Sequence, residues 1–154
     1  FYWGIFGYPF FLHIKYLFNL WRFSMSKTGS CLCGEVDFTY KSEPVMFLMC
    51  HCTDCQKSTG SPVASIIVVS EDNFSVSGPT NSYECKAKVT RSFCKICGSQ
   101  IFSRIESAPG VVAIKTGVLD EQPSHKPKLV CWTKSKPDWL EINHPEISFE
   151  ENPN

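Results

Sequence analysis

Nine cysteines in 154 residues constrain this chain more than any other feature, because seven of them fall into three short motifs. The densest motif is Cys50-His51-Cys52-Thr53-Asp54-Cys55, which combines C-x-C and C-x-x-C spacings. Both spacings let thiolates converge on one ion at about 2.3 Å from each sulfur without straining the backbone. Three ligands would leave tetrahedral zinc a fourth position for water or substrate. The alternative interpretation is a redox dithiol or a few buried cysteines.

Two further cysteine pairs strengthen the metal interpretation. Cys31-Leu32-Cys33-Gly34 precedes the first expected strand, and Cys94-Lys95-Ile96-Cys97-Gly98 has the form of a zinc knuckle. One pair cannot close a tetrahedral site, whereas two pairs can. We therefore expect two zinc ions: a closed structural site on Cys31, Cys33, Cys94 and Cys97, and an open site on Cys50, Cys52 and Cys55. A rival division closes the triplet with one more cysteine, for which Cys85 is a candidate.

The remaining cysteines, Cys85 and Cys131, each stand alone in the sequence. A lone cysteine usually packs as a small buried hydrophobe, so we assign neither a role. The odd total is not what a closed disulfide framework produces, and C-x-C pairs rarely meet disulfide geometry. These thiols therefore indicate a reducing compartment, most simply the cytoplasm.

Composition excludes several other classes of protein. The chain is 43% hydrophobic and 19% charged, which is typical of a globular domain. Fifteen basic residues balance fifteen acidic ones, so no net field favours nucleic acid or an anionic membrane surface. We expect no nucleic-acid partner, and no membrane association for residues 25–154, which form a single zinc-binding domain.

Residues 1–24 differ from the rest, because they are rich in aromatic side chains and contain no acidic residue. The uncharged run Phe1 to Ile14 is too short to span a bilayer. It also lacks the basic start and the small-residue cleavage site of a signal peptide. We expect a non-native extension here, with an anchor or targeting segment, or a packed element, as the alternatives.

After Met25 the pattern is that of an all-β domain of short strands. Val36, Phe38 and Tyr40 alternate with polar residues, and residues 64–69 are rich in β-branched side chains, which favours a buried strand. Further strands are expected at residues 45–49, 74–76, 101–102, 111–116 and 129–133. Residues 56–60 predict a single helical turn that ends at a glycine.

Taken in order, these motifs resemble the family of glutathione-dependent formaldehyde-activating enzymes, which includes centromere protein V-like members. The resemblance runs from Gly29 to Ile142 and rests on five stretches: residues 29–36, 50–55 with Gly60, 91–99, 115–120 and 137–139. It implies a β-tent fold of short antiparallel strands in two sheets, stapled by zinc. It also implies a structural zinc on Cys31, Cys33, Cys94 and Cys97, and a labile zinc on Cys50, Cys52 and Cys55.

The resemblance further implies a zinc-dependent carbon–sulfur lyase acting on an adduct of glutathione, or a similar thiol, with an aldehyde. A thiol bound to zinc is deprotonated, so such a site suits thiol chemistry. Arg91, next to the second pair, is a candidate for binding a glutathione carboxylate. His51 is expected to lie beside the metal ligands or to face solvent, rather than to bind metal.

One position departs from the family pattern. Counting back from Trp139, Val130 takes the place of a histidine that family members commonly show, with Cys131 after it. This departure puts formaldehyde as the substrate in doubt. Two other functions therefore stay open: a non-catalytic zinc scaffold that binds a partner, and a redox or metal-handling protein.

Overall fold

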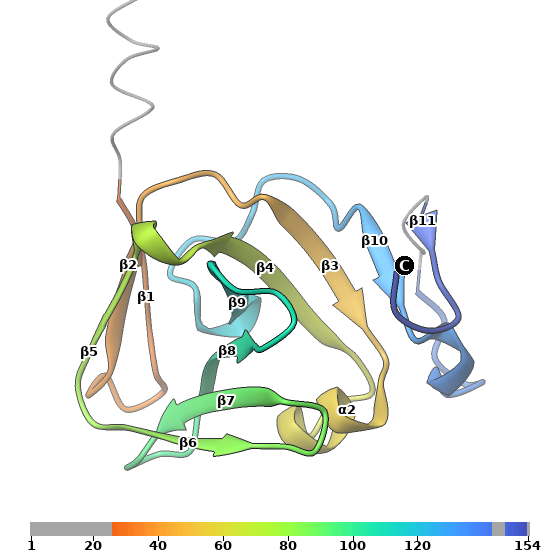
Figure 1. Ribbon diagram of the computed structural model, residues 1–154, viewed down its shortest axis with the longest axis horizontal. Helices are drawn as coiled ribbons and strands as arrows, with labels where there is room; N and C mark the ends of the chain where they lie inside the picture. Colours follow the sequence, from red (N-terminus) through yellow and green to blue (C-terminus); the bar gives the residue numbers. More distant parts are fainter. Residues whose placement is uncertain (1–25, 143–146, 154) are drawn as a thin grey trace, which may run out of the picture.

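Two β-sheets form the part of the chain that this computed structural model describes, residues 26–142 and 147–153 (Figure 1). The expectations for residues 1–24 lie outside the described residues. The strands are β1 (Lys27–Ser30), β2 (Asp37–Tyr40), β3 (Met46–Cys50), β4 (Ala64–Ser70), β5 (Phe74–Ser77), β6 (Thr80–Glu84), β7 (Val89–Cys94), β8 (Gln100–Ile105), β9 (Val111–Lys115), β10 (Leu129–Cys131) and β11 (Ile147–Ser148). The helical elements are α2 (Thr53–Thr59) and the 3-10 turns η1 (Glu71–Asn73), η2 (Thr116–Val118) and η3 (Thr133–Ser135). The all-β prediction is confirmed.

The small sheet has the order β1-β2-β5 and is antiparallel throughout. Its central strand follows the alternation seen in the sequence: Phe38 and Tyr40 are buried, whereas Asp37 is exposed. The buried face packs against the large sheet, because Phe38 and Tyr40 share one hydrophobic core with Ile67 and Ile114. The main core therefore lies between the two sheets.

The large sheet has the order β11-β10-β3-β4-β9-β8-β7-β6. Most of its strand pairs are antiparallel, but β10 runs parallel to both β3 and β11. The expectation of antiparallel strands alone is therefore wrong at this edge of the sheet. The chain passes through β4–β9 between β3 and β10, and so long a connection allows parallel pairing. The resulting register places Cys131 opposite Cys50.

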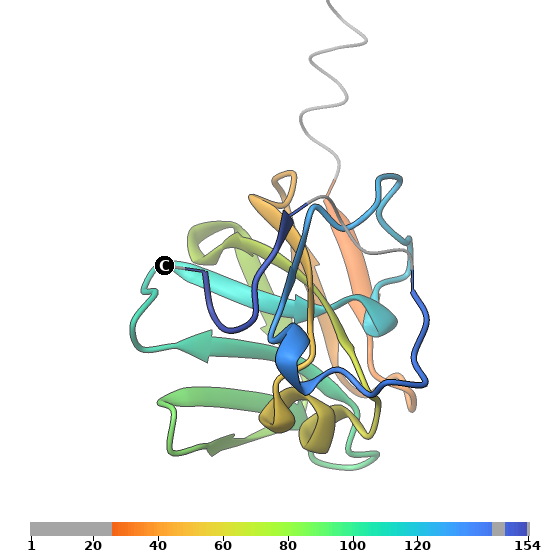
Figure 2. The same cartoon turned by 90° about the vertical axis from the view of Figure 1, so that its right-hand side faces the viewer.

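The helix α2 is longer than the predicted turn at residues 56–60, because it begins at Thr53. Cys52 is the N-cap residue, and its sulfur accepts a hydrogen bond from the backbone N–H of Cys55 at 3.3 Å. The predicted stop is confirmed, since Gly60 ends the helix in the left-handed conformation with φ of 67°. α2 and η3 follow the carboxyl ends of β3 and β10, and Figure 2 shows them next to each other. Gln56 Nε2 donates to the carbonyl of Ser135 at 2.9 Å.

Candidate metal centre

The two outer cysteine motifs meet at one edge of the main core. Cys31 Sγ lies 3.4 Å from Cys33 Sγ, and Cys33 Sγ lies 3.8 Å from Cys94 Sγ. Together with Cys97, these four sulfurs lie within 4.8 Å of one another. Tetrahedral zinc with bonds of about 2.3 Å would separate its sulfurs by about 3.8 Å, so the four thiols fit such an ion.

Tight turns hold each of these motifs in place. The amide of Gly34 donates to the carbonyl of Cys31, and the amide of Gly98 donates to the carbonyl of Cys94. Both glycines have positive φ, 78° and 76°, a conformation that most L-residues avoid. The glycine after each cysteine pair therefore serves the turn that aims the thiols.

Ser99 is a residue of this cluster that sequence reasoning missed. Its hydroxyl accepts a hydrogen bond from the backbone N–H of Leu32 at 3.1 Å and lies 3.3 Å from Cys97 Sγ. Ser99 thus connects the two motifs, and its hydrogen bonds lower the pKa of the Cys97 thiol to about 5. A thiolate is the form that binds a metal, so Ser99 favours binding at this site.

The central triplet forms the second cluster. Cys50 ends β3, Cys52 caps α2 and Cys55 lies in the first turn of that helix, and their sulfurs all lie within 4.8 Å of one another. Cys50 and Cys55 are buried, and Cys52 is partly buried. A hydrogen bond with the Cys50 thiol raises the pKa of Cys55, and burial and repulsion between the two thiolates act in the same direction. A bound cation would remove this penalty, which suits the triplet to a metal.

A buried lysine lies close to this second cluster. Lys115, at the end of β9, is only 7% exposed and interacts electrostatically with Cys55, Cys50 and Cys52. Burial lowers the pKa of Lys115, while these thiols act in the opposite direction. The sequence analysis included Lys115 only within the stretch 115–120 and assigned it no role. The available signal was a lysine that directly follows the apolar run 111–114 of an expected buried strand.

Arg91 is also buried, at 8% exposure, and its guanidinium already has neighbours. Nη1 donates to Cys85 Sγ at 2.8 Å, and Nη2 lies 4.0 Å from the Asp54 carboxylate. Arg91 also interacts electrostatically with Cys55. Its role in binding a substrate carboxylate stays a prediction, and a substrate would have to share the guanidinium with Cys85 and Asp54.

His51 does not face solvent, because its side chain is fully buried. Its Nδ1 lies 2.9 Å from the carbonyl oxygen of Pro62, which can only accept, so the proton resides on Nδ1. The backbone N–H of His51 donates to the carbonyl of Cys131 at 3.0 Å. His51 therefore helps to fix the loop between the first two cysteines of the triplet.

The two lone cysteines differ in their surroundings. Cys85 contacts Arg91 and belongs to neither cluster of thiols, so the geometry does not favour the rival division that would use it as a ligand. Cys131 is buried, as expected of a lone cysteine, but it lies opposite Cys50 and the two thiols interact. Sequence reasoning assigned Cys131 no role, and nothing in its local sequence marks it.

The departure at Val130 is easier to interpret in the structure. Val130 is fully buried in β10, one position before Cys131. Successive side chains of a strand point to opposite faces of the sheet. The residue of β10 that lies on the face of the triplet is therefore Cys131. The side chain of a histidine at position 130 would project from the opposite face of the sheet.

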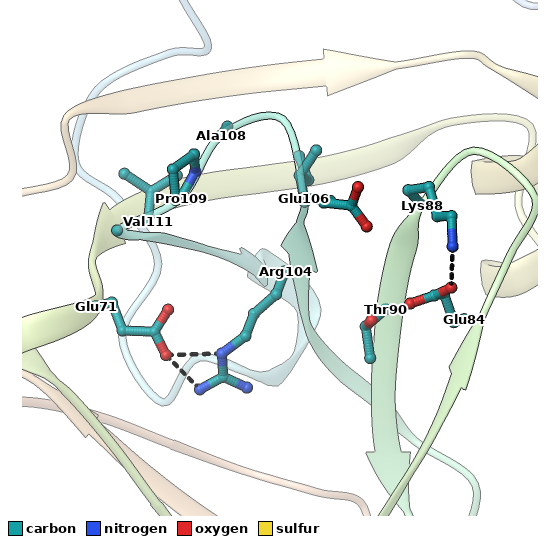
Figure 3. Close-up of a pocket in the computed structure, with 11 residues that line it drawn as sticks. Glu71, Glu84, Lys88, Thr90, Arg104, Glu106, Ala108, Pro109 and Val111 are labelled. Carbon is teal, nitrogen blue, oxygen red and sulfur yellow. Dashed lines mark hydrogen bonds and ion pairs between the residues drawn. The ribbon is translucent and has the colours of Figure 1, made fainter.

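Two surface cavities in the described part of the chain lie away from the thiols. A cavity of about 320 Å³ lies near the turn between β8 and β9 (Figure 3). It contains the ion pairs of Arg104 with Glu71 and of Lys88 with Glu84, and no cysteine lines it. None of the helices among the described residues is long and apolar enough to span a membrane.

All nine cysteines lie in the described part of the chain, and each is a free thiol. The expectation that the chain is not a disulfide framework therefore agrees with the structure. With its cysteines free, the chain keeps every thiol of both clusters available for a metal.

Comparisons with known proteins bear on both the family and the fold. Two proteins, from Aspergillus flavus and Aspergillus oryzae, carry the name of glutathione-dependent formaldehyde-activating enzymes and are each 32% identical to this chain over 81 residues. This match covers 49% of the chain and 42% of each relative, so the matched segment spans less than half the length of those proteins. A crystal structure of a Rhodobacter sphaeroides protein shares the fold, with a TM-score of 0.53, 19% identity, and coverage of 63% of this chain and 91% of that one. Residues 26–135 match the family described as glutathione-dependent formaldehyde-activating enzyme, and the chain belongs to that family.

Proposed function

We propose that this chain is a carbon–sulfur lyase that joins glutathione, or a similar thiol, to an aldehyde such as formaldehyde and also cleaves the adduct. The observation that carries the proposal is the convergence of Cys50, Cys52 and Cys55 within 4.8 Å, in a chain of this family. Three thiolates leave one position of a tetrahedral ion for an external thiol. The names of the Aspergillus relatives support the same substrates.

The reaction needs no electron carrier. In the forward direction the sulfur of the thiolate bonds to the carbonyl carbon, and the carbonyl oxygen takes up one proton to become a hydroxyl. In the reverse direction that proton leaves and the carbon–sulfur bond breaks. Bound zinc would supply a Lewis acid that keeps a substrate thiol deprotonated at neutral pH.

The residues of the chain contribute ligands, position and charge. Cys50, Cys52 and Cys55 would hold the labile zinc ion, and Cys31, Cys33, Cys94 and Cys97 would hold the structural one. Lys115 lies beside the triplet, where its positive charge stabilises an anionic sulfur. We further propose a cytoplasmic location, since nine free thiols persist best in a reducing compartment.

The test uses zinc-loaded protein, glutathione and 13C-labelled formaldehyde, with exchange between free aldehyde and adduct measured by NMR. We expect the chain to accelerate exchange, and Cys52→Ser to abolish the acceleration. Glu106→Gln, in the cavity away from the thiols, is the matched control and keeps the wild-type rate. Binding of glutathione without accelerated exchange would leave a binding module, and absence of thiol binding would end the enzyme proposal.

A second candidate is a non-catalytic zinc scaffold with the same fold. Two observations favour it: neither of two cavities in the described part of the chain is lined by a cysteine, and Arg91 is engaged by Cys85 and Asp54. A scaffold needs both metal sites but no thiol substrate. The same NMR experiment therefore separates the two functions.

A further inference from the structure

Cys131 is the buried nucleophilic group that the proposed function does not use. It ends β10, which pairs in parallel with β3, and its Cα lies in register with that of Cys50. Register partners on neighbouring strands point their side chains to the same face of a sheet. Both residues belong to one buried cluster that also contains Cys55, and Cys52 packs against that cluster.

In this structure the sulfur of Cys131 does not lie in the position of a metal ligand. Its sulfur donates to the carbonyl of Met49 at 3.6 Å, and it does not lie within 4.8 Å of all three sulfurs of the triplet. A change of one staggered χ1 rotamer moves a cysteine sulfur by about 3 Å. Such a rotation gives up only a long, weak hydrogen bond, since sulfur is a poor donor.

Positive charges close to the cluster bear on how many thiolates it can hold. A zinc ion with four thiolates carries two net negative charges, whereas three thiolates leave only one. Two buried cations, Lys115 and Arg91, interact with Cys55, and Asp54 offsets part of the charge of Arg91. A nearby positive charge lowers the cost of ionising a thiol, so two cations make a fourth thiolate easier to accommodate than one would.

We propose that Cys131 is the fourth protein ligand of the second metal site in its resting state, and that an incoming thiol substrate takes its place. The second clause rests on the proposed function, whereas the first does not. The exchange would conserve atoms and electrons, because the released Cys131 thiolate would take the proton that the substrate thiol gives up.

The test uses the full chain with zinc left in the first site and cobalt placed in the second after mild chelation. Cobalt reports its ligands, because each thiolate adds to the sulfur-to-cobalt charge-transfer band. We expect Cys131→Ala to lower the intensity per cobalt by about one quarter, as one of four thiolates is lost. We also expect it to weaken zinc binding at that site by about tenfold or more. Cys85→Ser, the matched control on the other lone cysteine, keeps a hydrogen-bond acceptor for Arg91 and leaves both values unchanged.

Equal intensity and equal zinc affinity in the wild type and Cys131→Ala would overturn the proposal. Should Cys131→Ala not fold, X-ray absorption of the wild-type protein with cobalt in the second site decides the question. Four sulfur neighbours support the proposal, and three refute it. This measurement needs neither a variant nor any catalytic activity.

A glutathione titration separates this proposal from the proposed function. If both hold, glutathione changes the cobalt spectrum of the wild type, and binds Cys131→Ala more tightly because no resident thiolate competes. Suppose that the charge-transfer band of Cys131→Ala has the intensity of one thiolate fewer, but glutathione changes the cobalt spectrum of neither protein. The ligand assignment then stands, and the lyase proposal fails. If glutathione binds both proteins equally and their spectra match, the ligand assignment fails alone.

Discussion

Removing one thiol of the first cluster, by Cys97→Ser, should cost far more stability than removing one thiol of the second. The first cluster links segments whose sulfurs, on Cys33 and Cys94, are 61 residues apart in the chain. It also joins the end of β1, in the small sheet, to the end of β7, in the large sheet. In the chain-entropy model, a cross-link that closes a loop of this length stabilises the fold by about 4 kcal/mol at 25 °C. This is a large part of the 5–15 kcal/mol that is typical of a domain.

The same calculation gives a smaller stabilisation for the second cluster. The triplet spans only residues 50–55, a loop whose closure is worth about 2 kcal/mol at most. Cys50 and Cys131 are already neighbours in one sheet, so a metal there holds together strands that the sheet already joins. In Cys52→Ser the new serine is itself a good N-cap residue, so α2 keeps its cap.

Urea unfolding at a fixed, buffered zinc concentration, followed by tryptophan fluorescence, measures both losses. We expect Cys97→Ser to lower the free energy of unfolding by about 4 kcal/mol or more, and Cys52→Ser by about 2 kcal/mol or less. Cys85→Ser, outside both clusters, controls for the loss of a thiol as such. Equal losses in the first two variants, or a larger loss in Cys52→Ser, would refute the structural role of the first cluster.

Three further predictions follow from the same sites and from the core. Elemental analysis should find two zinc ions per chain, of which mild chelation removes one first; a single ion, or two that leave together, would contradict the division of the thiols. Cys52→Ser should retain the far-ultraviolet circular dichroism of the wild type while binding only one zinc ion, and a variant that retains both ions would show that Cys52 is not a ligand. Burial, with help from the Glu43 and Glu121 carboxylates, raises the pKa of Tyr40 from about 10 to about 12. The neutral phenol therefore contributes stability that is complete below pH 10 and is lost between pH 10 and 12, by up to about 3 kcal/mol. Tyr40→Phe should remove this part of the alkaline destabilisation, and an identical alkaline profile in both proteins would contradict the assignment.

The sequence by itself determined the features that depend on short-range spacing. C-x-C and C-x-x-C spacings place thiols a few ångströms apart whatever the rest of the chain does, so the two clusters could be proposed before their geometry was known. Alternation identified β2, because one face of that strand is buried against the core. Gly60 marked the end of α2, since the left-handed conformation suits glycine.

Strands without such a pattern were not predicted. β6 is exposed along its whole length at the edge of the large sheet, and β1 has the polar sequence Lys-Thr-Gly-Ser. These segments are strands because a neighbouring strand offers hydrogen-bond partners, not because their own side chains alternate. Propensity and periodicity carry no signal for pairing of this kind.

Only the tertiary structure decided what surrounds the second cluster. Cys131 lies beside Cys50 because β10 pairs in parallel with β3, and a register shift of one residue would turn Cys131 to the opposite face and bring Val130 to the thiols. Lys115 lies near the same thiols because β9 packs next to β4, and β4 in turn pairs with β3. Register between strands so far apart in the chain is set by the assembled core, so the local sequence around residues 115 and 131 could not reveal it.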